Sequence, residues 1–348
     1  MRDVPGFSRR SVLAGGLAAP LAVPALITGA RANETFVLGT WGGDYQRLQL
    51  ENIELPLVRP LGLEAVADTG DEPPRVAKIM ATRRLPRGPL DVACLQAVQA
   101  YALGEAGVLE ELTPEKVPNL AHVKEGLATA TFAPHIWSPQ IISYSPERVT
   151  SPPTGFGDLA DPRYNGKVGF PDGNFFYVMM AAGLFAGGSA NDFDKAKEVM
   201  TKVNANGLRL YPSTDAGGPP FKTGEIDIGM MWLARISMWQ NAGIPVAAAF
   251  PKEGCILYVS GMVVPKNAPN KEAAFKYINA MLDPAAQLGF AKNMGYFPTV
   301  TNAPLTGKVA EQLALPTPPP KLVVPDFAFT SKIQPEIADW WKKSIQHG

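Results

Sequence analysis

Three short apolar runs near the start of the chain alternate with helical segments, and this alternation constrains the fold more than any other feature. The runs cover 35–40, 63–70 and 90–96, and each contains valine and leucine. After the first run, apolar residues recur at helical spacing behind Asp44, a good N-cap residue. After the second, Pro73 favours the first turn of another helix. This order predicts a parallel sheet with helices on its faces, which binds ligands beyond the carboxyl ends of its strands.

A second series of strands and helices in the middle of the chain predicts a second lobe. It begins at 168–172, after a stretch rich in proline and glycine. Its predicted helices are 174–186 and 192–205, and its predicted strands are 207–212, 227–232 and 245–251. A further strand over 255–265 and an amphipathic helix over 271–283 are predicted after this lobe. The chain is also long for one compact core, which favours two lobes. The proline-rich tail beyond 303 is expected to wrap the surface and to end in a helix near 333–345.

The first 32 residues have the features of an export signal. Arg9 and Arg10 form a twin-arginine pair ahead of an apolar run, and Ala30-Arg31-Ala32 matches a signal cleavage site. We therefore expect export by the twin-arginine route, cleavage near Ala32 and a periplasmic location. This segment holds four arginines and one aspartate, so its removal leaves 28 basic and 31 acidic residues. A net charge of −3 is not that of a basic nucleic-acid-binding protein, and no nucleic-acid partner is expected.

The cysteines and histidines are too few and too scattered to form a metal or catalytic site. They are Cys94, Cys255, His122, His135 and His347. Metal sites need such ligands at characteristic spacings, which are lacking here. No nucleophile motif and no phosphate-binding glycine motif is found either. We therefore expect no metal, no cofactor and no enzymatic activity, with both cysteines as buried free thiols.

Stretches spread over nearly the whole exported chain resemble the periplasmic solute-binding proteins of ABC importers. The resemblance is specifically to the spermidine/putrescine-binding branch of bacterial extracellular solute-binding family 1. The stretches include TWGGDYQ (40–46), DTGDEPPRVAK (68–78), LDVACLQ (90–96), ISYSPERV (142–149), GEIDIGMMW (224–232), and the run from MVVPK to GYFPT (262–299). The order and spacing of these pieces carry the resemblance more than any single piece does.

The resemblance implies the architecture and the mode of action. It implies two α/β lobes with central mixed sheets, joined by two crossing strands, as in type II periplasmic binding proteins. The implied parts are an N-terminal lobe (33–140 plus 256–303), a C-terminal lobe (141–255) and a wrapping segment (304–348), with crossings near 138–145 and 250–260. The lobes close on a solute by a hinge motion. The protein, expected to be a monomer, then delivers the solute to an inner-membrane ABC permease.

Aromatic residues match the positions that hold polyamines in the resembling branch. There, aromatic rings stack on the methylene chain, while carboxylates bind the amines. Trp41 matches the first aromatic position of the cleft, and Trp232 matches the one that ends a strand. Tyr258 stands where the branch usually has tryptophan, and Tyr296 lies in the GYFPT turn. The resemblance therefore predicts an aromatic-lined cleft.

The carboxylates of the polyamine-binding pattern are mostly missing. Ser260, Gly173 and Phe176 stand where the branch has acidic residues, and only Asp172 nearby is acidic. In contrast, Arg235 follows the strand-ending tryptophan by three residues, and an arginine beside a pocket favours a carboxylate or phosphate. The solute is therefore either polyamine-like or a carboxylate-bearing compound, such as an amino-acid-like, opine-like or aromatic one.

The candidate ligand-binding residues lie on strands or in the segments that follow them. They are Trp41, Gly42, Gly43, Asp44, Gln96, Asp172, Phe175, Phe176, Thr214, Asp215, Trp232, Arg235, Tyr258, Ser260 and Tyr296. The two glycines let the backbone approach a ligand, and the aspartates can hold an amine. Two other functions stay open, namely a periplasmic enzyme exported by the twin-arginine route and a solute receptor for a sensor kinase.

Overall fold

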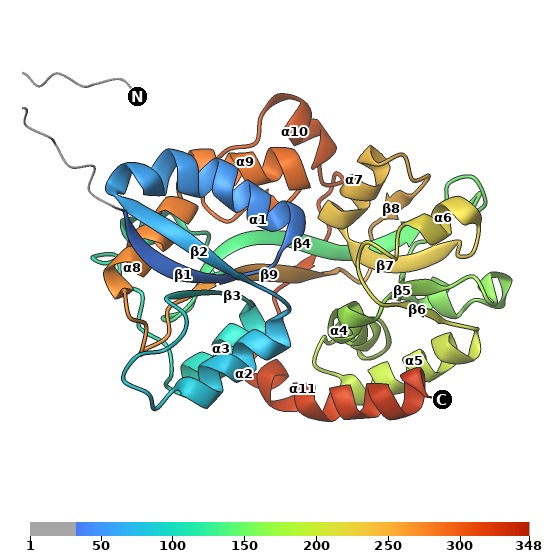
Figure 1. Cartoon of the computed structure of the whole chain (residues 1–348). Coiled ribbons are helices and arrows are strands. Elements are labelled where there is room, and N and C mark those ends of the chain that lie inside the picture. The colour runs from blue at the N-terminus through green and yellow to red at the C-terminus, as the bar shows by residue number, and fades with distance from the viewer. Residues whose placement is uncertain (1–32, 348) are drawn as a thin grey trace, which may run out of the picture. The chain divides into compact units, whose positions relative to one another are not determined.

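The computed structural model describes residues 33–347, which form two α/β lobes side by side (Figure 1). The predicted export signal over 1–32 lies outside the described residues, so the twin-arginine route stays a prediction. Among the described residues, no helix has both the length and the apolar character needed to cross a membrane.

The first lobe contains a mixed sheet in the order β10-β4-β9-β3-β1-β2. The strands β1 (Glu34–Thr40), β2 (Leu63–Thr69) and β3 (Val92–Gln96) pair in parallel, as predicted. The strands β4 (Ala133–Tyr144), β9 (Cys255–Val263) and β10 (Phe297–Pro298) run antiparallel to their neighbours. The helices of this lobe are α1 (Gly43–Gln49), α2 (Glu72–Thr82), α3 (Ala97–Glu105), α8 (Lys271–Met281) and α9 (Pro284–Met294).

The second lobe contains shorter strands and the apolar helix α4. The strands β5 (Gly169–Pro171) and β6 (Arg209–Tyr211) pair in parallel, while β7 (Ile228–Trp232) and β8 (Ala247–Ala249) pair antiparallel with β4. The helices are α4 (Phe175–Gly187), α5 (Phe193–Ala205), α6 (Pro219–Thr223) and α7 (Leu233–Asn241). Helix α4 is buried on most sides, which explains why its sequence is almost wholly apolar.

The strand β4 belongs to both lobes. Its first half pairs with β9, and its second half, from Gln140 to Tyr144, pairs with β7 and β8. The neighbouring β9 is buried along its whole length and also pairs with the short β11 (Leu322–Val323). The two strands cross between the lobes in Figure 1, where the resemblance places the crossing.

The C-terminal segment lies against both lobes. It contains α10 (Gly307–Gln312) and α11 (Phe327–Trp341), followed by a π-helical turn (Lys342–Gln346). Helix α11 packs against α3 of the first lobe and α4 of the second (Figure 1). It begins earlier than the predicted 333, because Asp326 Oδ1 accepts a hydrogen bond from the Phe329 N–H at 3.0 Å and caps the helix.

The first helix also differs from its prediction. The N-cap position is held by Gly42, not Asp44, whose carboxylate lies in the first turn and pairs with Arg47 at 3.0 Å. Beyond Gln49 the chain continues as a π-helix (Leu50–Val58) that contains Pro56. Proline has no N–H to donate, which disfavours a regular α-helix at this point.

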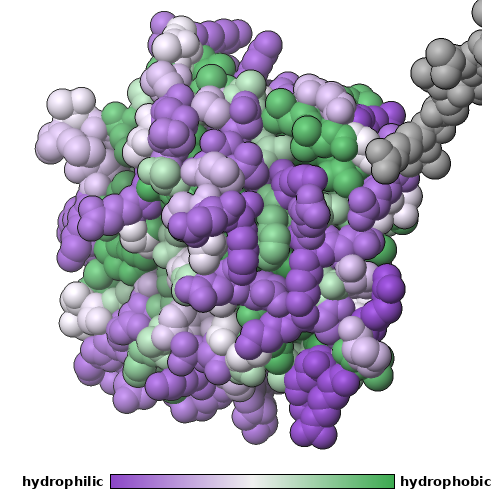
Figure 2. All heavy atoms as spheres, turned by 90° about the vertical axis from the view of Figure 1, so that its left-hand side faces the viewer, coloured by the Kyte–Doolittle hydropathy of each residue, from purple (hydrophilic) through white to green (hydrophobic). Residues whose placement is uncertain are grey.

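The face of the first lobe that Figure 2 shows is mostly hydrophilic. Figure 2 shows this end of the molecule, with hydrophobic side chains in small separate groups among hydrophilic ones. Exposed apolar residues that are scattered in this way are ordinary for a globular protein. Cys94 and Cys255 are both buried free thiols.

Candidate functional site

A pocket of about 400 Å³ lies where the carboxyl ends of strands from both lobes meet. Trp41 and Gln96 line it from the ends of β1 and β3 in the first lobe. Pro171, Pro212 and Trp232 line it from the ends of β5, β6 and β7 in the second. Ligands of open α/β sheets bind at such strand ends, and the volume suits a small organic molecule.

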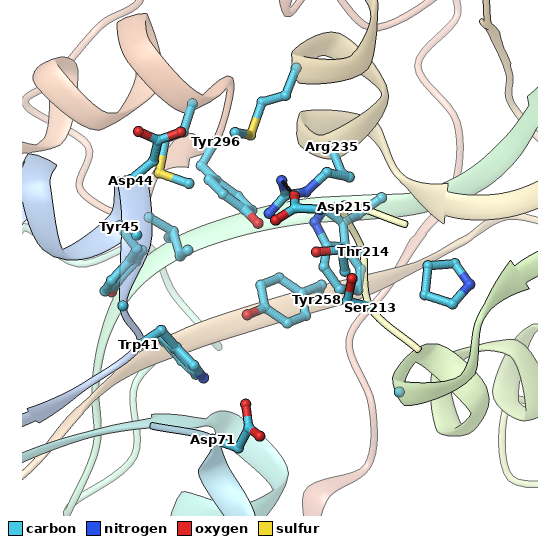
Figure 3. Close-up of a pocket in the computed structure, with 18 of the residues that line it drawn as sticks. Trp41, Asp44, Tyr45, Asp71, Ser213, Thr214, Asp215, Arg235, Tyr258 and Tyr296 are labelled. Atoms are coloured by element: carbon cyan, nitrogen blue, oxygen red, sulfur yellow. Dashed lines mark hydrogen bonds and ion pairs between the residues drawn. The ribbon is translucent and has the colours of Figure 1, made fainter. Parts of the chain in front are cut away.

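Most of the candidate residues from the sequence line this one pocket. They are Trp41, Gly42, Gly43, Asp44, Gln96, Thr214, Asp215, Trp232, Arg235, Tyr258 and Tyr296. Figure 3 shows the two lobes contributing from opposite sides, with Tyr258 between Trp41 and Arg235. Contact of these residues with a solute stays a prediction.

Asp172 and Phe175 do not line the pocket, contrary to expectation. Both carboxylate oxygens of Asp172 accept hydrogen bonds from the C-terminal segment, from Trp341 Nε1 at 2.8 Å and from Gln346 Nε2 at 2.6 Å. The ring of Phe175 packs against that of Trp341, with centroids 5.6 Å apart. The C-terminal helix, which the sequence placed only loosely, therefore takes both side chains away from the pocket.

Phe176 and Ser260 also lie outside the pocket lining. The ring of Phe176 is buried and stacks on Phe193 of α5, with centroids 5.4 Å apart. The hydroxyl of Ser260 is buried between β9 and β3 and donates a hydrogen bond to the Leu95 carbonyl at 3.3 Å. Both side chains hold elements of the fold together.

Several lining residues were missed by the sequence analysis. They are Tyr45, Asp71, Ile136, Pro171, Gly173, Pro212, Ser213, Met238 and Met294. Asp71 could have been found, because it follows the second predicted strand and so belongs to a loop at a carboxyl end. Met238 lies one helical turn after Arg235, a spacing that would have indicated it. Ile136 and Met294 carry no signal that separates them from ordinary core residues.

The backbone after β1 turns sharply at the pocket, which explains one of the two glycines. Gly43 has a φ of +62°, a left-handed conformation that residues with a side chain rarely adopt. Gly42 has ordinary extended backbone, with a φ of −81°. The turn starts α1 directly after β1 and leaves Trp41 at the pocket wall.

A buried arginine ties together the three strand ends of the first lobe. The guanidinium of Arg75 donates hydrogen bonds to the carbonyls of Thr40 at the end of β1, Gly70 just beyond β2, and Cys94 within β3. It also lies over the ring of Trp41, 5.6 Å from the centroid. This single side chain therefore fixes the edge of the sheet that forms the pocket.

The neighbouring Glu72 holds the loop after β3. Its Oε1 accepts a hydrogen bond from the Gln96 N–H at 2.5 Å. Burial raises the pKa of Glu72 to about 7, although this hydrogen bond and the charge of Arg75 act in the opposite direction. Gln96 lines the pocket, so its position depends on a carboxyl group behind it.

A buried chain of polar groups supports Tyr45, another lining residue. The Tyr45 hydroxyl lies 2.7 Å from His135 Nδ1, and the Cys94 thiol donates to the same hydroxyl at 3.3 Å. Burial lowers the pKa of His135 to about 3, so its imidazole is neutral at neutral pH and Nδ1 can accept a hydrogen bond from the hydroxyl. Trp41 packs edge-on against the ring of Tyr45, with centroids 5.2 Å apart.

An aromatic stack lines the pocket where the two lobes meet. The rings of Trp232 and Tyr258 stack with centroids 4.6 Å apart and an interplanar angle of 15°. Tyr296 lies beyond, with its centroid 6.2 Å from that of Tyr258. Such flat faces stabilise the apolar part of a small ligand.

Hydrogen-bond donors without acceptors lie next to this stack. Arg235 Nη1 donates to Asp215 Oδ1 at 2.8 Å, but the side chain of Arg235 is 15% exposed and that of Asp215 is 85% exposed. Arg235 Nε is buried and makes no hydrogen bond with the described residues. Trp232 Nε1 is also buried and makes no well-formed hydrogen bond with them, although it faces the Tyr296 hydroxyl, whose pKa burial raises and Arg235 and Trp232 act to lower. Buried donors are nearly always paired in folded proteins, so these two are candidates to receive an acceptor from a bound molecule.

No metal site accompanies the pocket within residues 33–347. This part of the chain has no group of three or more His, Cys, Asp or Glu side chains placed to hold a metal ion. The chemistry available at the pocket is that of stacking, hydrogen bonding and charge.

Residues 63–317 match the family model of the bacterial extracellular solute-binding proteins, so the chain belongs to this family. The family is one of binding proteins, which counts against the alternative of an exported enzyme. The chain is 27% identical over 222 residues to the spermidine/putrescine-binding periplasmic protein of Escherichia coli (strain K12). That match covers 60% of this chain and only 63% of the relative's length.

Solved structures confirm the fold that the resemblance implied. An ABC transporter substrate-binding protein from Bradyrhizobium japonicum USDA 110 superposes with a TM-score of 0.78 at 23% identity, covering 90% of this chain and all of that one. The Atu4243-GABA receptor superposes with a TM-score of 0.79 at 21% identity, covering 89% of this chain and 97% of that one. The chain therefore has the two-lobed fold of type II periplasmic binding proteins.

Proposed function

We propose that the protein is the solute-binding component of an ABC importer. It captures a small organic solute with a carboxylate group between its two lobes and delivers the solute to an inner-membrane permease. The family, the fold and the pocket between strand ends of both lobes support this role. The name of the Bradyrhizobium japonicum structure, an ABC transporter substrate-binding protein, agrees with it.

The observation that carries the nature of the solute is the pair of buried donors, Arg235 Nε and Trp232 Nε1. Both belong to residues that line the pocket. A buried donor without a partner costs about 1–3 kcal/mol, more when it is charged, and a ligand that supplies the acceptor recovers this energy. A carboxylate has two acceptor oxygens and matches the geometry of a guanidinium.

A polyamine is the main alternative solute, because it is named for the Escherichia coli relative. The stacked rings of Trp232 and Tyr258 suit a methylene chain as well. However, an amine near Arg235 meets a like charge beside the Asp215 carboxylate, and neither unpaired donor can bond to an ammonium group. The Atu4243-GABA receptor is named for a compound with a carboxylate, which agrees better with this pocket.

The remaining parts of the proposal follow from the export signal and the family. The protein works in the periplasm as a monomer, after export by the twin-arginine route and cleavage near Ala32. The residues 1–32 that carry this signal contain Arg9 and Arg10 in the expected pattern.

A thermal-shift screen tests the proposal. The purified protein is unfolded and refolded once to remove carried-over solute, and then mixed with polyamines, amino acids, opine-like conjugates and aromatic acids. A ligand at 100 times its Kd stabilises the protein by about 2.7 kcal/mol, which is easily seen. We expect shifts with carboxylates and not with polyamines.

Two variants assign the response to the pocket. Arg235→Gln is expected to weaken a carboxylate ligand by about 2–5 kcal/mol, because a desolvated charge pair is lost. Arg209→Gln is the matched control, since this arginine is 49% exposed, pairs with Glu225 and lies outside the pocket lining. A shift with polyamines alone, unchanged in Arg235→Gln, would refute the carboxylate assignment.

A further inference from the structure

The acidic residues of the pocket differ in whether they already have a partner. Asp44 pairs with Arg47, and Asp215 pairs with Arg235. Asp71, at the start of α2, is exposed and forms neither an ion pair nor a side-chain hydrogen bond with any of residues 33–347. It is therefore the acidic group of the lining that is available to a ligand.

Asp71 and Arg235 lie on opposite sides of the pocket. Figure 3 shows Asp71 below Trp41 on the side of the first lobe and Arg235 above Tyr258 on the side of the second. The aromatic rings of Trp41 and Tyr258 lie between them. The pocket is therefore polarised, with a carboxylate at one end, a guanidinium at the other and apolar faces in between.

The charge behind Trp41 affects what can bind at the Asp71 end. The guanidinium of Arg75 already lies over the Trp41 ring, 5.6 Å from its centroid. A ligand ammonium group therefore gains less from this ring than from a free indole, because a second cation competes for the same π electrons. Binding of an ammonium group at this end depends on the carboxylate of Asp71.

We infer that the solute is an open-chain zwitterion whose ammonium group binds Asp71 in the first lobe and whose carboxylate binds Arg235 in the second. This inference rests on the proposed function and makes Asp71 a residue that determines specificity. A zwitterion with separated charges bonds to both lobes at once and so favours their closure. A diamine or a dicarboxylate finds a like charge at one end, and a simple carboxylate leaves Asp71 without a partner.

A matched set of four-carbon probes tests the inference by titration calorimetry. All four probes have a four-carbon chain. Putrescine has two ammonium groups, and 4-aminobutyrate has one ammonium group and one carboxylate. Succinate has two carboxylates, and butyrate has one. The five- and six-carbon homologues are included because the spacing of the charges matters. We expect the zwitterions to bind at least tenfold more tightly than the other probes of equal length.

The variant Asp71→Asn tests the role of the carboxylate. It is expected to lower the affinity for the best zwitterion at least tenfold and to leave butyrate unchanged, so that the preference for a zwitterion is lost. The matched control is Asp68→Asn, which removes a charge from β2 at a residue that pairs with Lys78 and does not line the pocket. This control is expected to leave both affinities unchanged.

The possible results separate the inference from the proposed function. The inference is overturned if putrescine or succinate binds most tightly, if Asp71→Asn binds the zwitterion as wild type does, or if no probe binds at millimolar concentration. In each of these cases the proposed function still stands if solute released from the unstripped protein, identified by mass spectrometry, binds again. The proposed function fails if no such solute is found and no compound of the thermal-shift screen binds.

Discussion

Removal of the Arg75 guanidinium is expected to destabilise the first lobe strongly. The substitution Arg75→Met keeps a long side chain but removes the donors to the carbonyls of Thr40, Gly70 and Cys94. The site is built for the guanidinium, because Gly39 leaves room for it. A Cβ atom at Gly39 would lie 3.1 Å from both Cδ and Nε of Arg75.

The size of the effect follows from these contacts. A hydrogen bond to a charged donor contributes about 1.5–3 kcal/mol, and breaking a buried charged network costs about 3–5 kcal/mol. The Thr40 carbonyl keeps another partner, since it also accepts from the Gly70 N–H at 3.1 Å. We therefore expect the free energy of unfolding to fall by about 3–5 kcal/mol, at the lower end if water reaches the other carbonyls.

Urea denaturation at pH 7 measures this change directly. The control is Arg59→Gln, because Arg59 is 46% exposed and its one ion pair within residues 33–347 is with Glu64 at 3.5 Å. An exposed pair of this kind is expected to contribute less than about 1 kcal/mol. A loss below about 1 kcal/mol in Arg75→Met, equal to that of the control, would refute the idea that Arg75 anchors the strand ends.

Two further predictions concern buried titratable groups behind the pocket. Burial raises the pKa of Glu72 in the folded protein to about 7, above its ordinary 4.5. Protonation of Glu72 therefore stabilises the folded protein fully below pH 4.5, and this stabilisation is lost as the pH rises through 7. Between pH 4.5 and pH 8, the free energy of unfolding of Glu72→Gln should therefore rise by about 3 kcal/mol relative to that of wild type, as measured by urea denaturation. The same pH dependence of the free energy of unfolding in both proteins would contradict this prediction. Tyr45→Phe leaves His135 Nδ1 without a hydrogen-bond donor and should lower the free energy of unfolding by about 1–3 kcal/mol. The control Tyr144→Phe should change this free energy little, and equal losses in the two variants would argue against the hydrogen bond.

The alternation of apolar runs and helical segments was enough to predict the main elements of both lobes. Strands such as β3 are short, apolar and buried on both faces, so their sequence signal is strong. The first helix was placed less well, because its N-cap is a glycine without a capping side chain. The start of α11 depends on a single capping residue, Asp326, within a proline-rich tail.

The site was predicted best where it depends on strand ends. Trp41, Gln96 and Trp232 directly follow or end strands, so topology alone directs them to one edge. Asp172 occupies an equivalent position after β5, yet the C-terminal helix binds its carboxylate. A contact between residues so far apart in the chain has no local pattern, and no periodicity indicates it.

The networks behind the pocket were also invisible in the sequence. No sequence pattern separates Arg75 and Glu72 from surface residues at the start of a helix, although both are buried. Their burial follows from the way three strand ends meet around one guanidinium, which is a property of the tertiary fold. Charged residues are rarely buried unless they are paired in this way.

The central claim is that the pocket binds a solute carboxylate through Arg235 and Trp232. A crystal structure of the protein with the tightest ligand of the thermal-shift screen tests it most directly. We predict that the lobes close on the solute, with carboxylate oxygens about 3 Å from Arg235 Nε and Trp232 Nε1. A solute bound outside this pocket, or bound within it while both donors stay unpaired, would contradict the account.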